Sequence, residues 1–198
     1  MTKMRARLRG LYAITPEVPD ALGRVRQALE GGIALLQYRR KRRDPDEARE
    51  VAALARRYQV PLIVNDDIEL ALELDAAGAH LGRSDGDLGV ARRRLAGKIL
   101  GASCYNDAEM ARRAIESGAD YVAFGSVFAS PTKPQAVRAP LALFALEAGV
   151  PLCAIGGITL HNAAQAIDAG ADLLAVLSDL FDAPDIAARA AQYRKLFA

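Results

Sequence analysis

Acidic and basic side chains recur directly after short apolar segments of this 198-residue chain. Asp66 and Asp85 each follow one such segment, and carboxylate oxygens are ligands that Mg²⁺ accepts in proteins. Arg39 and Lys41 follow another segment and Lys133 a third, and cations of this kind bind phosphate oxygens. If the fold brings these positions together, they predict a site for Mg²⁺ and a diphosphate, because the two carboxylates would otherwise repel the anion.

Two further segments could bind anions. Residues 130–134 (SPTKP) place two hydroxyls and one lysine among prolines, directly after an apolar segment, which suits a phosphate or a pyrophosphate. The pair Gly156-Gly157 follows the next apolar segment, and we expect it to open a helix whose free N–H groups would bind a phosphate. The alternative for residues 130–134 is an ordinary surface turn with a solvated lysine.

The apolar segments themselves predict eight buried strands alternating with eight helices. Each segment is a continuous rather than an alternating apolar run, which is typical of a parallel sheet covered on both faces. We expect strands at residues 11–15, 33–38, 62–64, 79–82, 99–102, 121–124, 152–155 and 173–177. We expect helices at residues 22–29, 45–58, 68–74, 88–95, 107–117, 141–148, 161–169 and 184–197.

This alternation predicts an α/β fold, a TIM barrel of the (β/α)₈ type with eight parallel strands in a single domain spanning residues 1–198. The sequence Gly-Ala-Asp bridges helix to strand at both 118–120 and 170–172, as expected for repeated units. A doubly wound open sheet is the alternative, but no G-x-G-x-x-G sequence follows the first strand. In a barrel, the segments directly after the strands share one rim, where the polar residues would meet.

Composition and charge narrow the class of protein. The net charge of +2 gives no strong reason to expect nucleic acid as a partner, and the basic run 92–94 is interpreted as a solvated face. No apolar run approaches the roughly 18 residues of a membrane span. Cys104 and Cys153 lie in or beside apolar runs and predict buried thiols in a reducing compartment. We therefore expect a cytoplasmic protein that binds neither nucleic acid nor membranes; the sequence specifies no oligomeric state.

Several polar residues have a purely structural alternative. Asp66 and Asp85 could each cap the helix that follows, since a carboxylate accepts hydrogen bonds from the first free N–H groups. Gln37 could be a buried polar group satisfied by its neighbours. His80 lies inside a strand between small apolar residues, which favours a packed, hydrogen-bonded histidine over a general base.

The order and spacing of these motifs resemble the thiamine-phosphate synthase family, from Leu11 to Ser178. The motifs are Gln-x-Arg-x-Lys at 37–41, Val-Asn-Asp at 64–66, His-Leu-Gly-x-x-Asp at 80–85, Gly-x-Ser at 101–103, Pro-Thr-Lys-Pro at 131–134 and Ile-Gly-Gly-Ile at 155–158. The resemblance implies a transferase that joins 4-amino-2-methyl-5-(diphosphooxymethyl)pyrimidine to 4-methyl-5-(2-phosphooxyethyl)thiazole or its carboxylated form. The products would be thiamine phosphate and pyrophosphate, with carbon dioxide lost in addition from the carboxylated form, and the reaction would be a dissociative substitution assisted by Mg²⁺.

The resemblance also implies roles for individual residues. Asp66 and Asp85 would hold Mg²⁺. Arg39, Lys41, Ser103 and Lys133 would be catalytic, acting on the pyrimidine diphosphate together with Gln37 and Asn65. The full substrate-binding set is Gln37, Tyr38, Arg39, Arg40, Lys41, Asn65, Ser103, Ser130, Pro131, Thr132, Lys133, Gly156, Gly157, Leu177 and Ser178, of which Ser130, Thr132, Gly157, Leu177 and Ser178 would contact the thiazole phosphate. The chain departs from the usual family pattern at Arg40, Arg83 and Ser130.

Two other functions remain open at this point. A thiazole tautomerase, a proton-transfer paralogue on a similar barrel, would want a histidine two residues beyond Ser103, where this chain has Tyr105. A non-catalytic phosphate-binding barrel that senses thiamine intermediates would bind both small molecules without turning them over.

Overall fold

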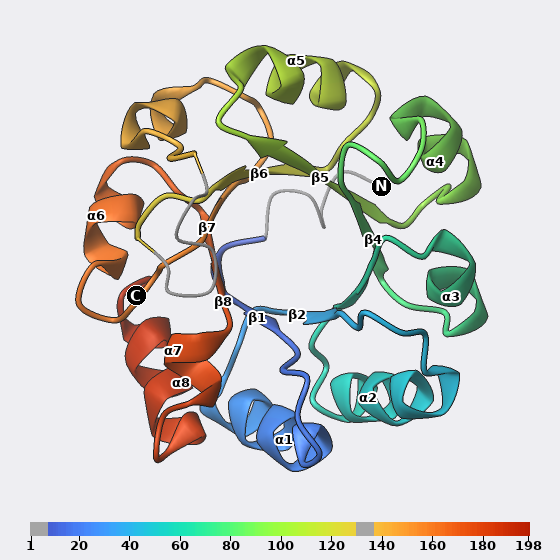
Figure 1. The fold of residues 1–198 in the computed structure, drawn as a ribbon, viewed down its shortest axis with the longest axis vertical. Coiled ribbons are helices and arrows are strands. Elements are labelled where there is room, and N and C mark those ends of the chain that lie inside the picture. The colour runs from blue at the N-terminus through green and yellow to red at the C-terminus, as the bar shows by residue number, and fades with distance from the viewer. Residues whose placement is uncertain (1–7, 130–136) are drawn as a thin grey trace.

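The structure is a computed structural model that describes residues 8–129 and 137–198. Eight parallel strands pair in sequence order, and the last strand pairs with the first, so that the sheet closes into a barrel (Figure 1). The strands are β1 (Gly10–Ile14), β2 (Leu35–Tyr38), β3 (Leu62–Asn65), β4 (Gly78–Leu81), β5 (Ile99–Tyr105), β6 (Tyr121–Gly125), β7 (Leu152–Ile155) and β8 (Leu173–Val176). The TIM-barrel fold predicted from the apolar runs is confirmed.

Helices surround the barrel on its outer side (Figure 1). They are α1 (Ala21–Gly31), α2 (Pro45–Arg57), α3 (Ile68–Glu73), α4 (Leu88–Arg94), α5 (Ala108–Glu116), α6 (Ala163–Asp168), α7 (Ser178–Phe181) and α8 (Ile186–Lys195), with a short 3₁₀ helix, η2 (Leu141–Ala145), between β6 and β7.

One helix is shorter than expected, and another was not predicted. The eight-residue helix predicted at 141–148 is the five-residue η2, which follows Pro140 and ends before the turn at Gly149. The short helix α7 was not predicted, because its four residues are too few to show a helical period.

The strands separate two buried layers. The inner layer fills the barrel lumen with residues that alternate along each strand, among them Tyr12, Ile63, Tyr121 and Leu173. The outer layer packs the opposite strand faces against the helices. Every second side chain of a strand therefore points into the lumen. Polar residues at those positions can contact one another there.

The repeated Gly-Ala-Asp turns form matching hydrogen bonds at the amino ends of the strands. The N–H of Asp120 donates to the Leu100 carbonyl at 2.7 Å, and the Asp120 carboxylate accepts from the Leu100 N–H at 2.8 Å. Asp172 makes the same pair of bonds with Leu152, at 2.8 and 2.9 Å. Each turn therefore joins the start of one strand to the start of the strand before it, β6 to β5 and β8 to β7.

The basic run 92–94 is only partly the solvated face that we expected. Arg92 is half-buried and donates to the Asp120 carboxylate at 2.8 Å and to the Lys98 carbonyl at 2.7 Å. Its neighbour Arg94 is exposed and pairs with Glu69. Arg92 is thus a structural residue that supports the first of the two turns.

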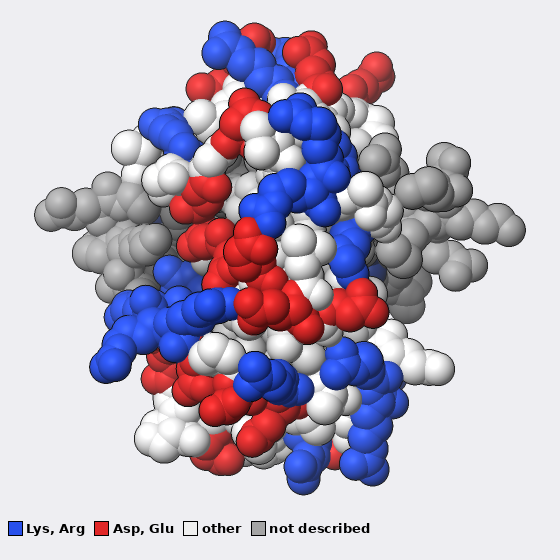
Figure 2. All heavy atoms as spheres, turned by 90° about the vertical axis from the view of Figure 1, so that its right-hand side faces the viewer, with Lys and Arg blue, Asp and Glu red and all other residues white. Residues whose placement is uncertain are grey.

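The outer surface over α3 and α4 carries both signs of charge. Figure 2 shows lysine and arginine side chains interspersed with acidic ones on this face. Ion pairs join Arg43 to Glu73 at 3.0 Å and Lys98 to Asp75 at 2.6 Å. No helix in the described part of the chain is long and apolar enough to cross a membrane.

Candidate active site at the carboxyl ends of the strands

The predicted polar residues that the structure describes lie at one end of the barrel, which we call the carboxyl rim: the carboxyl ends of the strands and the segments that directly follow them. Gln37, Asn65 and Ser103 stand on β2, β3 and β5 at positions that alternate with outward-facing residues. Asn65 is in register with His80 of β4. The barrel therefore brings together side chains that are far apart in the sequence.

Asp66 and Asp85 face one another at the rim. Partial burial of the carboxylate, and next the adjacent Asp85 carboxylate, raise the pKa of Asp66 to about 6, although the residue as a whole is exposed. The nearby charge of Arg39 and a 2.6 Å hydrogen bond from the Asn65 amide act in the opposite direction. Two carboxylates held this close favour either a shared proton or a cation.

The capping alternative for these two aspartates is wrong, because their neighbours cap the helices. The side chain of Asp67 accepts from the Leu70 N–H at 2.8 Å and caps α3. The side chain of Asp87 accepts from the Val90 N–H at 2.8 Å and caps α4.

Neither rim aspartate has a helical role. Asp66 has a left-handed backbone with φ of 62°. The Asp85 carboxylate accepts from the Gly82 N–H at 2.6 Å. That bond holds Asp85 in the β4–α4 loop, where it faces Asp66 rather than a helix end.

The cations after β2 divide into two kinds. Arg39 and Lys41 are exposed, with the Lys41 ammonium 3.6 Å from Glu17. Arg40 is instead held by Glu47 of α2 and donates to the Thr15 hydroxyl at 3.0 Å. Arg39 and Lys41 therefore have side chains that can reach a ligand, whereas that of Arg40 fastens the loop to α2.

Tyr38 has its side chain in the outer layer, where its hydroxyl donates to the Asp44 carbonyl at 2.9 Å. Its predicted contact with substrate would therefore have to come from its backbone, and the same holds for Arg40. Ser130, Pro131, Thr132 and Lys133 lie outside the described residues, so their predicted roles rest on the sequence motif.

Gly156 and Gly157 do not open a helix, which corrects our expectation. Both have left-handed φ values, 96° and 65°, and α6 begins only at Ala163. A Cβ on Gly157 would lie 2.3 Å from the carbonyl oxygen of Ala129. The glycine pair therefore makes a tight turn against the segment that follows β6. Leu177 and Ser178 follow β8 on the same rim, where α7 begins.

His80 is the packed, hydrogen-bonded histidine that we expected. Its Nδ1 lies 2.9 Å from the Tyr121 hydroxyl and its Nε2 lies 2.8 Å from the Ser103 hydroxyl. Burial lowers the pKa of His80 to about 4, so that the ring is neutral at pH 7. A neutral imidazole with both nitrogens occupied is poorly placed to act as a general base.

Sequence reasoning missed the two tyrosines that complete this network. The Tyr121 hydroxyl lies 2.8 Å from that of Tyr12, which accepts from the Gln37 amide at 2.7 Å. Both tyrosines were assigned only to apolar strand segments. Their positions alternate with outward-facing residues in the same way as those of Gln37 and His80, and this period of two was the signal that could have found them.

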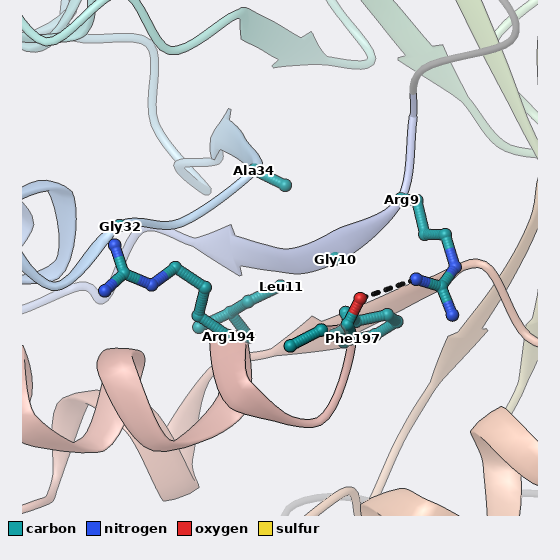
Figure 3. Close-up of a pocket in the computed structure, with 8 residues that line it drawn as sticks. Arg9, Gly10, Leu11, Gly32, Ala34, Arg194 and Phe197 are labelled. Carbon is teal, nitrogen blue, oxygen red and sulfur yellow. Dashed lines mark hydrogen bonds between the residues drawn. The ribbon is translucent and has the colours of Figure 1, made fainter.

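The opposite end of the barrel carries a hollow of about 420 Å³ (Figure 3). It is lined by the amino ends of β1 and β2 and by the end of α8, and the Arg9 guanidinium donates to the Phe197 carbonyl there at 2.7 Å. None of the predicted site residues that the structure describes lines it. Catalysis in TIM barrels takes place at the carboxyl ends of the strands, so we do not place the active site in this hollow.

Comparisons with known proteins decide the family. A family model described as thiamine monophosphate synthase matches residues 11–180. The chain belongs to the thiamine monophosphate synthase family. The thiamine-phosphate synthase of Aromatoleum aromaticum is 61% identical to it, over 96% of this chain and 97% of that protein. The thiamine-phosphate synthase of Methylobacillus flagellatus is 54% identical, over 96% of each chain.

Solved structures agree with membership of the family. Thiamine phosphate pyrophosphorylase from Pyrococcus furiosus superimposes with a TM-score of 0.86 and 33% identity, covering 96% of each chain. A 3-hexulose-6-phosphate synthase superimposes with a TM-score of 0.77 at 17% identity, over 96% of this chain and all of that one, and shares the fold alone. The family resemblance of the sequence motifs is thus confirmed.

Proposed function

We propose that this chain is a thiamine-phosphate synthase that works as a single-domain barrel in the cytoplasm. It would join the pyrimidine diphosphate to the thiazole phosphate and release pyrophosphate. The observation that carries the proposal is the facing pair Asp66 and Asp85, freed from helix capping and set beside Arg39 on the carboxyl rim. The buried thiols of Cys104 and Cys153, which form no disulfide, are compatible with a reducing compartment.

The facing carboxylates suit Mg²⁺ as the metal. Among the described residues, no group of three or more His, Cys, Asp or Glu side chains could enclose an ion. Mg²⁺ is commonly held by only one or two carboxylates, with water and substrate phosphate oxygens completing its shell, and the pair Asp66 and Asp85 fits that pattern. When bound, the ion would neutralise negative charge on the diphosphate as it leaves.

The residues around this pair would hold the pyrimidine diphosphate. Gln37, Asn65 and Ser103 would contact it from the lumen side, and Arg39, Lys41 and Lys133 would meet the diphosphate from the rim. These cations stabilise charge that grows as the bond to the departing pyrophosphate breaks.

The loops after β6, β7 and β8 would hold the second substrate. The thiazole phosphate would bind to Ser130, Pro131 and Thr132, with Gly156, Gly157, Leu177 and Ser178 completing its site. Loops after the seventh and eighth strands often bind phosphate in TIM barrels, which supports this assignment.

The reaction requires the protein to bind both substrates and to stabilise the charge that develops on the leaving group. The pyrimidine amino group donates electrons into the ring, so the CH₂–O bond can ionise and the electron pair leaves with pyrophosphate. The thiazole nitrogen then attacks the CH₂ cation. No enzyme nucleophile or strong base is required, in keeping with the neutral, fully hydrogen-bonded His80.

The test is formation of thiamine phosphate by the purified protein. We expect product only when both substrates and Mg²⁺ are present, with one pyrophosphate released per thiamine phosphate. Binding of both substrates without product would favour the sensing barrel instead. Isomerisation of the carboxylated thiazole phosphate in the absence of the pyrimidine would favour the tautomerase. Either result with folded protein would refute the proposal.

A further inference from the structure

A chain of four hydrogen bonds crosses the barrel lumen from Gln37 to Ser103. The Gln37 Nε2 lies 2.7 Å from the Tyr12 hydroxyl, which lies 2.8 Å from that of Tyr121. The Tyr121 hydroxyl lies 2.9 Å from the His80 Nδ1, and the His80 Nε2 lies 2.8 Å from the Ser103 Oγ. The chain begins and ends on residues to which the proposed function gives a part in substrate binding, while its three middle residues have no assigned role.

We propose that Tyr12, Tyr121 and His80 are positioning residues that fix the direction in which the Ser103 hydroxyl donates. The proposal rests on the proposed function only in taking Ser103 to be a substrate contact. The three residues do not touch the reacting atoms in this scheme; they act through the serine.

The direction follows from counting protons along the chain. The Gln37 Nε2 can only donate, so the Tyr12 oxygen accepts and its own proton goes to Tyr121. The proton of Tyr121 then goes to the His80 Nδ1, which leaves the hydrogen of the neutral ring on Nε2.

The Ser103 oxygen accepts that last hydrogen bond from the His80 Nε2. Its own hydrogen must therefore point away from the imidazole. Ser103 stands where the lumen meets the carboxyl rim and is only half-buried, so the hydrogen is available to a ligand acceptor.

The opposite direction of hydrogen bonding would leave one buried hydroxyl hydrogen without an acceptor in this network. If Ser103 donated to the His80 Nε2, the ring would carry its hydrogen on Nδ1 and donate to Tyr121, and Tyr121 would donate to Tyr12. The Tyr12 oxygen would then accept two hydrogen bonds, and the hydrogen of the Tyr12 hydroxyl would have no acceptor among these five residues. A buried donor without an acceptor is unfavourable, so the first direction is preferred.

The packing around Tyr121 supports a dedicated arrangement. A Cβ on Gly101 would lie 2.1 Å from the Tyr121 ring, so that glycine makes room for it. The Tyr121 ring also stacks on His80, with ring centroids 5.5 Å apart, and meets Tyr12 edge-on at 5.9 Å. Burial raises the pKa of both tyrosines, which keeps both phenols protonated. The number of protons in the chain is therefore constant.

The first test is the tautomer of His80, read from ¹⁵N chemical shifts of the imidazole nitrogens in the wild-type protein. The protein contains two histidines, His80 and the exposed His161. A His161→Gln variant lacks the His161 signals, so the signals that remain are those of His80. We expect the hydrogen on Nε2 in the wild type. A hydrogen on Nδ1, or a charged ring at pH 7, would overturn the proposal. This readout needs no substrate, so it stands even if the proposed activity fails.

The second test removes one oxygen from the centre of the chain. Tyr121→Phe leaves the His80 Nδ1 without its donor, so the tautomer is no longer fixed and the Ser103 hydrogen is no longer held away from the ring. The KM for the pyrimidine diphosphate should rise about tenfold, the effect of one lost hydrogen bond, while the KM for the thiazole phosphate stays unchanged. Equal rises in both KM values, or none in a folded variant, would overturn the proposal.

A matched control separates positioning from stability. Tyr193 is also fully buried, and its hydroxyl donates to Asp179 at 2.7 Å on the outer side of the barrel. Tyr193→Phe should lower the melting temperature but leave both KM values and the His80 tautomer unchanged. A rise in the pyrimidine KM in this control too would mean that the effect of Tyr121→Phe is one of general stability.

A double-mutant cycle tests the route through the serine. In a Ser103→Ala background the hydroxyl is already missing, so adding Tyr121→Phe should raise the pyrimidine KM no further. Full additivity of the two substitutions would show that Tyr121 acts by another path, and would overturn the proposal.

Discussion

Arg92 and Asp120 form an ion pair at the amino ends of the strands, with 2.8 Å between Nη1 and Oδ2. The Asp120 carboxylate also accepts from the Leu100 N–H, so one side chain binds both the half-buried Arg92 guanidinium and the start of a strand. Of the residues proposed to bind substrate, those within the described ranges 8–129 and 137–198 lie at the other end of the barrel.

Asp120→Ala should destabilise the protein without changing its chemistry. Removing one partner of a buried ion pair leaves the other uncompensated, and typically costs about 3–5 kcal/mol. Asp172→Ala removes only the equivalent bond to Leu152 and should cost about 1–3 kcal/mol. Urea denaturation measures both. A loss for Asp120→Ala no larger than that for Asp172→Ala would mean that the ion pair adds little.

Asp66→Asn and Asp85→Asn should each lower turnover at least about a hundredfold, because a metal acting on a leaving group contributes several kcal/mol. The neighbouring caps provide matched controls, since asparagine caps a helix as well as aspartate does. Asp67→Asn and Asp87→Asn should therefore retain near-normal turnover. Normal activity in Asp66→Asn and Asp85→Asn, or in EDTA-treated wild-type enzyme, would refute the metal assignment.

The effect of Mg²⁺ on stability should depend on pH. The pKa of Asp66 is raised to about 6, above the value of about 3.9 expected in the unfolded chain. Protonated Asp66 therefore stabilises the metal-free protein at low pH, and this contribution is lost as the pH rises through about 6. Mg²⁺ should raise the melting temperature strongly at pH 7.5 and weakly at pH 5.

Asp66→Asn isolates the same carboxylate in the stability measurement. The variant should melt higher than the metal-free wild type at pH 7.5, because the repulsion from Asp85 is gone. It should also lose most of the response to Mg²⁺. An equal Mg²⁺ response at the two pH values in the wild type would contradict the assignment.

Gly157→Ala should impair the thiazole phosphate site by displacing the segment after β6. The added Cβ would lie 2.3 Å from the Ala129 carbonyl oxygen. Gly149 has almost the same φ, 67° against 65°, but nothing lies within 4 Å of its Cβ position. Gly149→Ala therefore carries the backbone strain alone. We expect the KM for the thiazole phosphate to rise only in Gly157→Ala. Equal KM values in the two variants would show that the close contact with Ala129 does not affect binding of the thiazole phosphate.

Lys133→Ala should lose synthase activity with little change in stability, because one cation of the diphosphate site is removed. A surface substitution usually changes stability by no more than about 0.5 kcal/mol. Lys195→Ala removes the same charge from the exposed end of α8 and should retain full turnover. Turnover and melting temperature should be measured together. Normal turnover of folded Lys133→Ala would favour the ordinary surface turn.

The sequence was sufficient to predict the barrel because each strand is a continuous apolar run between turn residues. It was also sufficient to place Asp66 and Asp85 on one rim, since a barrel gathers whatever follows its strands. Which aspartate caps a helix could not be predicted: Asp66 and Asp67 are adjacent and chemically identical, and the backbone conformation of Asp66 decides between them.

The tyrosine chain in the lumen was missed for a different reason. Hydropathy scores a tyrosine as part of an apolar strand, whereas the role of Tyr121 depends on partners that are 41 and 109 residues away. The turn at Gly156-Gly157 was misassigned because a glycine pair is compatible both with a helix start and with a tight turn. Only the approach of the Ala129 carbonyl distinguishes them.

The two Gly-Ala-Asp turns have a consequence for how this barrel can evolve. They secure the strands at one end, while substrate recognition is assigned to loops at the other, so the two demands fall on different residues. Substitutions that change which molecules the rim accepts need not weaken Asp120 or Asp172. Stabilising substitutions near these turns would raise the free energy of unfolding. The protein could then tolerate destabilising substitutions at the rim, such as those that accompany a change of substrate specificity in directed evolution.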